Sequence, residues 1–159
     1  MRSDCGSTGS RRARARFQWL LTLLLAASSL LSGCGLETER RQMPAEIDAA
    51  VASITADIAA GRYEKVYNEA SELWRQDSSL EQSTVLLKTL NEKLGTVKHR
   101  TVHTAIEQEN SGGDLKGRVF IVTYRTTFER GEGMESFTFV ERNRQWLLAR
   151  YRVSSMELK

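Results

Sequence analysis

The sequence predicts an α+β fold, in which about three N-terminal helices pack on a curled antiparallel sheet of three or four strands. Between residues 44 and 94, apolar side chains recur at helical spacing. From Thr96 onward, β-branched and aromatic residues alternate with polar ones between glycine-containing turns. Three amphipathic helices in succession need a flat apolar surface to cover, and the strands that follow provide it.

The first helix is expected over about residues 44–60. Proline suits the first position of a helix, and Gly61 suits its C-terminal end. The apolar residues of this segment fall at spacings of 4, 3 and 4 and therefore share one face: Ile47, Val51, Ile54 and Ile58.

Two further helices are expected. The second covers about residues 63–75 and carries an aromatic-rich stripe that we assign to the core. The third begins at a capping box formed by Ser79 and Gln82 and stops at Gly95. Its inward-facing leucines are expected to be Leu80, Leu87, Leu90 and Leu94.

The strands are expected at about residues 97–107, 118–129, 134–142 and 145–153. The turns between them are expected at residues 110–114, 131–133 and 143–144. Val119 and Ile121 lie on the face opposite Phe120, so both sides of the sheet should be covered at that end. The inward residues of the last strand are expected to be Leu147, Ala149, Tyr151 and Val153.

The first 33 residues have the pattern of an export signal. A cluster of arginines precedes about fifteen mostly apolar residues that end near Leu31. A membrane-spanning helix needs about 20 apolar residues, so this run is marginal as a permanent span. We therefore expect cleavage, with an uncleaved membrane anchor as the alternative.

The end of this run resembles the lipobox of bacterial lipoproteins, with Leu31, Ser32 and Gly33 before Cys34. The resemblance implies that diacylglycerol is attached to the Cys34 thiol and that the chain is cut before this residue. Two or more acyl chains make membrane attachment durable. Gly35 stands where the enteric signal for inner-membrane retention has aspartate, which implies the outer membrane, facing the periplasm.

The expected organisation is a signal peptide at residues 1–33, a lipidated cysteine with a tether at 34–43, and a single α+β domain at 44–159. The whole chain has 23 basic and 20 acidic residues; without the signal it has 18 and 19. The basic character thus belongs to the signal, and no nucleic-acid partner is expected. Cys5 leaves with the signal and Cys34 is lipidated, so no disulfide, cysteine metal site or cofactor is expected.

Several phrases, in this order, resemble the bacterial family called domain of unknown function 4019. They are Gly61-Arg62-Tyr63, residues 122–128, Glu135-Ser136-Phe137 and residues 146–151. The resemblance implies a cone-like fold of the nuclear transport factor 2-like or cystatin-like group. It also implies a homodimer through the sheet, since related cone folds often pair in this way. The family has no assigned activity, so no catalytic residues are transferred from it.

The candidate ligand site is the concave sheet face, because related cone folds hold ligands there. The residues expected to line it are Phe120, Tyr124, Phe137, Phe139 and Tyr151. These side chains are mostly hydrocarbon, which favours a filled core. In an open cone, Tyr124 and Tyr151 would orient a ligand.

The remaining polar residues form no catalytic pattern. His99 and His103 are separated by about 13 Å if they lie in a strand, which is too far for one metal ion. Glu129, Glu132 and Glu135 are expected at a solvated hairpin tip, where no pocket shifts a pKa. An enzyme would therefore lack the buried polar group that it needs.

These observations favour a lipid-anchored envelope protein whose domain binds a protein or peptide partner, or acts as a scaffold, without catalysis. The first alternative is a small-ligand-binding module that uses the cone interior; the second is an isomerase-like or hydratase-like enzyme. A cavity lined by Tyr124 and Tyr151 would favour the ligand-binding module. A buried ionisable residue facing that cavity would favour the enzyme, and a closed core with an exposed apolar patch would favour the partner-binding protein.

Overall fold

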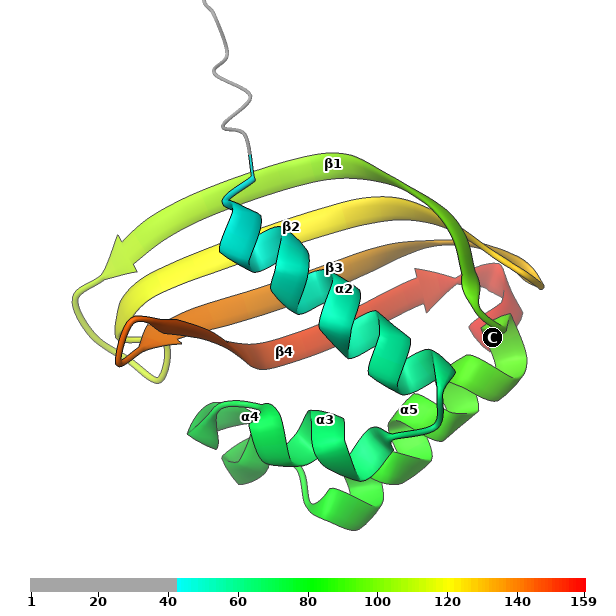
Figure 1. Cartoon of the computed structure of the whole chain (residues 1–159), viewed down its shortest axis with the longest axis horizontal. Helices are drawn as coiled ribbons and strands as arrows, with labels where there is room; N and C mark the ends of the chain where they lie inside the picture. The colour runs from blue at the N-terminus through cyan, green and yellow to red at the C-terminus, as the bar shows by residue number, and fades with distance from the viewer. Residues whose placement is uncertain (1–42) are drawn as a thin grey trace, which may run out of the picture. The chain divides into compact units, whose positions relative to one another are not determined.

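The computed structural model describes residues 43–159. In this part of the chain, four α-helices precede a four-stranded antiparallel sheet, which confirms the α+β class (Figure 1). The helices are α2 (Ala45–Ala59), α3 (Tyr63–Glu69), α4 (Glu72–Asp77) and α5 (Leu80–Leu94). The strands are β1 (Val97–Asn110), β2 (Gly117–Phe128), β3 (Gly131–Arg142) and β4 (Gln145–Ser155), and a short 3-10 helix, η2 (Met156–Leu158), follows them. The export signal and Cys34 lie outside the described residues.

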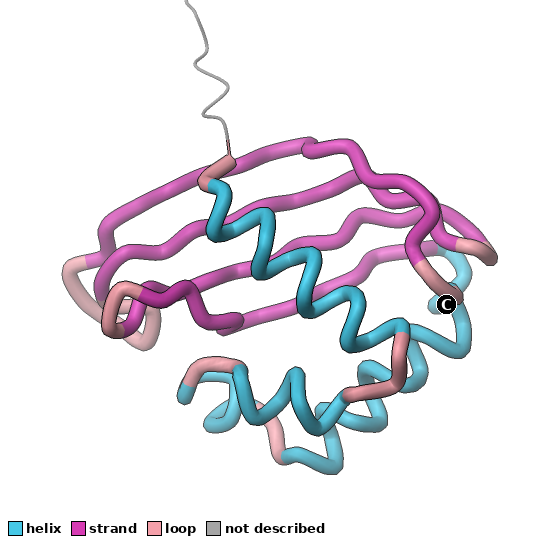
Figure 2. Tube along the Cα trace, in the orientation of Figure 1, coloured by secondary structure: helices cyan, strands magenta, loops and turns pink. Residues whose placement is uncertain are grey.

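The sheet is curled and open, with strand order β1-β2-β3-β4, so that β1 and β4 are its two edges. Helix α2 crosses the concave face of the sheet, and α3, α4 and α5 form a second group near β4 (Figure 2). Helix α2 turns Ile47, Val51 and Ile58 into the core, as the apolar spacing predicted. The concave face is therefore the inside of the molecule.

The expected second helix is in fact two helices. The chain between them is extended at Ala70 and Ser71, with ψ angles of 165° and 163°. Ser71 is buried there, and its backbone N–H donates to the carbonyl oxygen of Leu148 in β4 at 2.9 Å. The prediction of one helix was wrong because the edge of β4 takes a backbone hydrogen bond that a continuous helix would have kept for itself.

The third predicted helix, α5, has the expected ends. The Ser79 hydroxyl accepts from the Gln82 N–H, and the Gln82 side chain accepts from the Ser79 N–H, which confirms the capping box. Gly95 ends the helix with φ = 74°, a conformation that favours glycine. Leu87 and Leu94 are buried, but Leu80 is 37% exposed. Helical side chains tilt toward the N-terminus, so the side chain of the first residue projects beyond the helix.

The glycines at 131 and 133 do not form the expected turn. The turn is at Glu129 and Arg130, while Gly131 pairs with Phe128 inside the β2–β3 ladder. A Cβ atom on Gly133 would lie 2.8 Å from the carbonyl oxygen of Ser154. This glycine therefore allows β3 and β4 to approach closely. The hairpin at residues 143–144 is confirmed, with positive φ at both turn residues.

Strand β4 has a bulge that changes which side chains face the main core. Phe139 pairs with Leu148 and Thr138 pairs with Arg150, which leaves Ala149 as the extra residue. Trp146 and Leu148 consequently join Tyr151 and Val153 in or against the main core. The expectation that Leu147 and Ala149 face the main core was wrong, because strict alternation does not hold across a bulge.

Ala149 belongs to a second cluster on the convex side, together with Val119 and Val140. Leu73 of α4, Leu115 of the β1–β2 connection and Ile121 pack against this cluster. Both faces of the sheet are thus covered at this end, as Val119 and Ile121 predicted.

Candidate functional site: a buried arginine–glutamate pair

The five residues expected to line the cone are all buried in the main core. Phe137 lies at the centre, with its ring centroid 6.0 Å from that of Tyr124, 6.2 Å from Phe139 and 4.7 Å from Tyr151. Phe120 contacts Trp146 edge to face at 6.2 Å. The centre of the concave face is therefore filled by aromatic rings.

A small cavity remains at one end, between α2, α5 and the start of β1. Its volume is about 30 Å³, which admits about one or two water molecules. Its polar lining includes Asn91, Arg100, Glu135 and Tyr151. Of the five predicted residues, Tyr151 is the one that lines this cavity.

Glu135 is the residue that sequence reasoning placed wrongly. It is completely buried in β3, opposite Tyr124 of β2 and Val153 of β4. The signal for its burial was present, since Phe139 and Phe137 point inward and one further step of the same alternation reaches Glu135. The glycines nearby suggested a solvated tip, but they belong to the strand.

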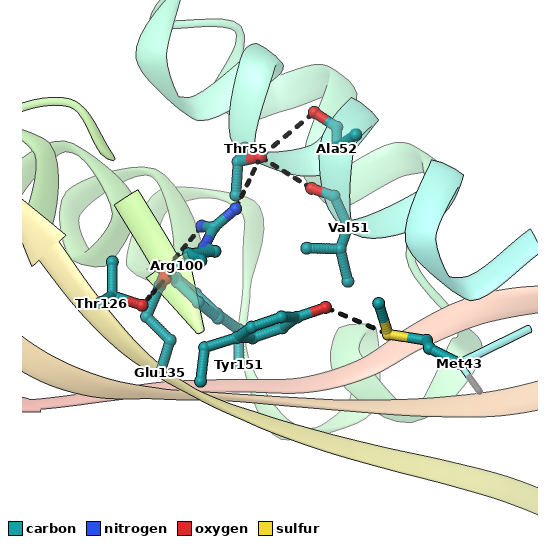
Figure 3. A network of polar contacts seen from close by, with 9 residues as sticks. Met43, Val51, Ala52, Thr55, Arg100, Thr126, Glu135 and Tyr151 are labelled. Carbon is teal, nitrogen blue, oxygen red and sulfur yellow. Dashed lines mark hydrogen bonds and ion pairs between the residues drawn. The ribbon is translucent and has the colours of Figure 1, made fainter. Parts of the chain in front are cut away.

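Both oxygens of the Glu135 carboxylate are saturated with hydrogen bonds. Figure 3 shows the residues of this network. Oε2 accepts from Arg100 Nε and from Thr126 Oγ1, each at 2.6 Å. Oε1 accepts from Arg100 Nη2 at 2.9 Å and from the Tyr151 hydroxyl at 2.8 Å. A carboxylate has about four acceptor positions, and here four donors occupy them.

Arg100 was also missed by sequence reasoning. It lies in β1 opposite Thr126, and its side chain is 16% exposed. Its Nη1 donates to Thr55 Oγ1 of α2 at 3.3 Å, and Thr55 in turn donates to the carbonyl oxygen of Val51 (Figure 3). The guanidinium carbon lies 5.6 Å from the ring centroids of both Tyr124 and Phe137, close enough for cation–π contact. Arg100 thus joins β1, β3 and α2.

The two tyrosines of the core are hydrogen-bond donors. Burial raises the pKa of Tyr151 well above its ordinary value and raises that of Tyr124 to about 12. The Tyr151 hydroxyl donates to Glu135, and the Tyr124 hydroxyl donates to Met43 Sδ at 3.2 Å. A general base needs a free acceptor within reach of a substrate proton, and these contacts leave none on Glu135.

The other ionisable candidates are at the surface. His99 and His103 are exposed in β1, and His99 Nε2 lies 3.2 Å from Thr101 Oγ1. Glu129 accepts from Lys98 Nζ at 2.8 Å, and this contact holds the pKa of Glu129 at about 2. Within residues 43–159, no group of three or more histidine, cysteine, aspartate or glutamate side chains is placed to hold a metal ion.

A second concave region lies on the surface between α2, α3 and β4. Its volume is about 370 Å³. We call it the β4 groove and define it by its apolar lining, Ile54, Val66, Trp146 and Leu148, with Ser53 at its exposed rim. It is more than ten times larger than the cavity beside Glu135.

Comparison with known proteins identifies the family. Residues 50–151 match the family described as Protein of unknown function (DUF4019), and this span includes Arg100, Glu135 and the β4 groove. No curated protein matches the chain. None of the helices in the described part of the chain is long and apolar enough to cross a membrane. The matched span covers most of the sequence, and the chain therefore belongs to the DUF4019 family of proteins of unknown function.

Proposed function

We propose that this protein is a lipid-anchored component of the bacterial cell envelope whose domain binds a protein or peptide partner without catalysing a reaction. The observation that carries the proposal is the saturated carboxylate of Glu135 in a filled core. Catalysis by this carboxylate would require breaking contacts that join all four strands. The polar groups around Glu135 are thus committed to the fold.

The two alternatives are less well supported. Ligand pockets usually enclose about 300–1,000 Å³, whereas the cavity beside Tyr151 has about 30 Å³. Glu135 is a buried ionisable residue that faces a cavity, which is the feature expected of the enzyme alternative. The space is nevertheless too small for an organic substrate, and Glu135 has no unused acceptor.

The β4 groove is the binding surface that we include in this proposal. Its volume of about 370 Å³ falls in the range of ligand sites, and its lining is mainly apolar. An extended peptide could place one or two apolar side chains against Trp146 and Ile54. The curled sheet with α2 across it also supports a cone-like fold of the nuclear transport factor 2-like or cystatin-like group.

Attachment to the membrane rests on the resemblance of residues 31–34 to a lipobox. The segment between Cys34 and Pro44 is expected to act as a tether that spans about 30 Å when extended. This reach keeps the domain close to the membrane surface, which we propose is the periplasmic face of the outer membrane.

The anchor can be tested by replacing Cys34. Cys34→Ser is expected to abolish incorporation of radiolabelled palmitate in the native host, because the hydroxyl does not accept the diacylglycerol. Cys5→Ser is the matched control and should keep the label, since this cysteine lies in the discarded signal. Label that persists on Cys34→Ser would overturn the anchor.

The β4 groove can be tested with two arginine substitutions on α2. Ser53 lies at the rim of the groove, whereas Ala56 is exposed on the same helix and does not line the groove. Ser53→Arg should fill the groove and weaken capture of envelope partners at least about tenfold, which corresponds to about 1.4 kcal/mol. Ala56→Arg should leave capture unchanged. The measurement is quantitative mass spectrometry after crosslinking in envelope membranes; equal capture by the two variants would exclude the groove.

A further inference from the structure

Strand β1 is an open edge of the sheet. It contains 14 residues and pairs with β2 on one side; in the described residues no strand pairs with its other side (Figure 1). Val102 is 46% exposed and Ile106 is 50% exposed. An edge of this kind presents backbone N–H and C=O groups to which another strand can add.

The charges along β1 are ordered from basic to acidic. Lys98 and Arg100 stand at its start, where they pair with Glu129 and Glu135 of the same chain, and Glu109 stands near its end with Glu107, which accepts from Arg118. The six residues between them, 101–106, carry no acidic or lysine and arginine side chains. If a second copy of β1 pairs antiparallel with the first, the basic end of each strand lies beside the acidic end of the other. A parallel arrangement would instead bring like charges together.

A bulge in β1 makes this pairing geometrically consistent. The ladder with β2 shifts between Val102 and Thr104, so His103 is an extra residue. In a regular strand, residues 100 and 107 would point to opposite faces. Because of the bulge, Arg100 and Glu107 both lie on the concave face, opposite Thr126 and Phe120 of β2.

The same correspondence holds for the next two pairs. Thr101 and Ile106 both lie on the convex face, opposite Arg125 and Ile121. Val102 and Ala105 both lie on the concave face, opposite Tyr124 and Val122. A twofold axis perpendicular to the sheet keeps each face on its own side, so partners across it must share a face. The register centred on Thr104 satisfies this condition at all three pairs.

We propose that two copies of this chain pair through β1, antiparallel and centred on Thr104, to form one continuous eight-stranded sheet. Arg100 of each copy then lies opposite Glu107 of the other, Thr101 lies opposite Ile106, and Val102 lies opposite Ala105. Thr104 lies beside its own symmetry mate. Both concave faces, and with them both Met43 residues, lie on the same side of the joined sheet. This is compatible with two tethers that lead to one bilayer.

The position of Thr104 on the axis gives a direct test. Thr104 is exposed, so a charged side chain there should leave the fold intact. Thr104→Lys and Thr104→Glu each place two like charges side by side, and each should weaken the dimer about fivefold or more. An equimolar mixture of the two variants should restore a dimer that contains one copy of each. Thr89→Lys, at an exposed position on α5, is the matched control and should dimerise like the wild type.

The measurement is sedimentation of the full chain in detergent over a range of concentrations, with circular dichroism to confirm that each variant is folded. A wild-type chain that stays monomeric at every concentration would overturn the proposal. So would variants that dimerise normally, or a mixture that forms no mixed dimer. In a second measurement, Thr104→Cys should form disulfide-linked dimers in envelope membranes, and Thr89→Cys should not. These outcomes are independent of the β4 groove and its partner.

Discussion

Replacing Glu135 by alanine is expected to lower the free energy of unfolding by about 3–5 kcal/mol, the usual cost of removing one partner of a buried ion pair. The substitution leaves the guanidinium of Arg100 beneath α2 without its counter-ion. It also removes the acceptor of the Thr126 and Tyr151 hydroxyls, both of which are buried. Urea unfolding followed by tryptophan fluorescence would measure the loss.

The double variant Arg100→Met with Glu135→Leu provides the control for this interpretation. When both charges are replaced by apolar side chains of similar size, no buried charge remains, and much of the lost stability should return. The double variant should therefore be more stable than Glu135→Ala. If Glu135→Ala costs less than about 1 kcal/mol, water reaches the pair and the network does not determine the stability of the sheet.

Replacing Phe137 by alanine is expected to cost about 3–5 kcal/mol, in the range measured for aromatic residues in protein cores. Phe137 is fully buried, and its ring contacts the rings of Tyr124, Phe139 and Tyr151. The shortened side chain would leave a cavity at the point where the aromatic rings meet. It would also remove one of the two ring faces against which Arg100 lies.

Two further variants are the controls for this prediction. Phe137→Leu keeps most of the volume and should cost less than half as much as the alanine variant. Val85→Ala, on the outer surface of α5, should change the stability by no more than about 0.5 kcal/mol, because Val85 is 60% exposed. A small effect of Phe137→Ala would mean that the core rearranges to fill the space.

The sequence predicted most of the elements because their signals are local. The apolar spacing of α2, the capping box at Ser79 and the hairpin at residues 143–144 all depend on residues close together in the chain. The break between α3 and α4 could not be predicted in this way. It depends on a hydrogen bond from Ser71 to Leu148, which lies far along the chain.

The sequence predicted only part of the candidate site, again because local signals can be read from it and contacts between distant residues cannot. The aromatic residues of the concave face followed from strand alternation, and all five are buried there. The pair of Arg100 and Glu135 joins residues 35 positions apart, so neither residue alone indicated that the other would neutralise it. Strand β1 has a second register shift, between Val97 and His99, and this shift interrupted the alternation that would have placed Arg100 on the concave face.

Because of the bulge at Ala149, strand β4 tolerates the deletion of a residue at this position better than at positions further along the strand. Deletion of Ala149 would leave Leu148 and Arg150 opposite the same partners in β3, so each remaining side chain would keep its present face. Deletion of Arg152, which lies beyond the bulge, would instead rotate the following residues and carry Val153 to the convex side. This strand can therefore lose one residue at the bulge without a change of register, whereas a deletion beyond the bulge turns the side chains that follow it to the other face.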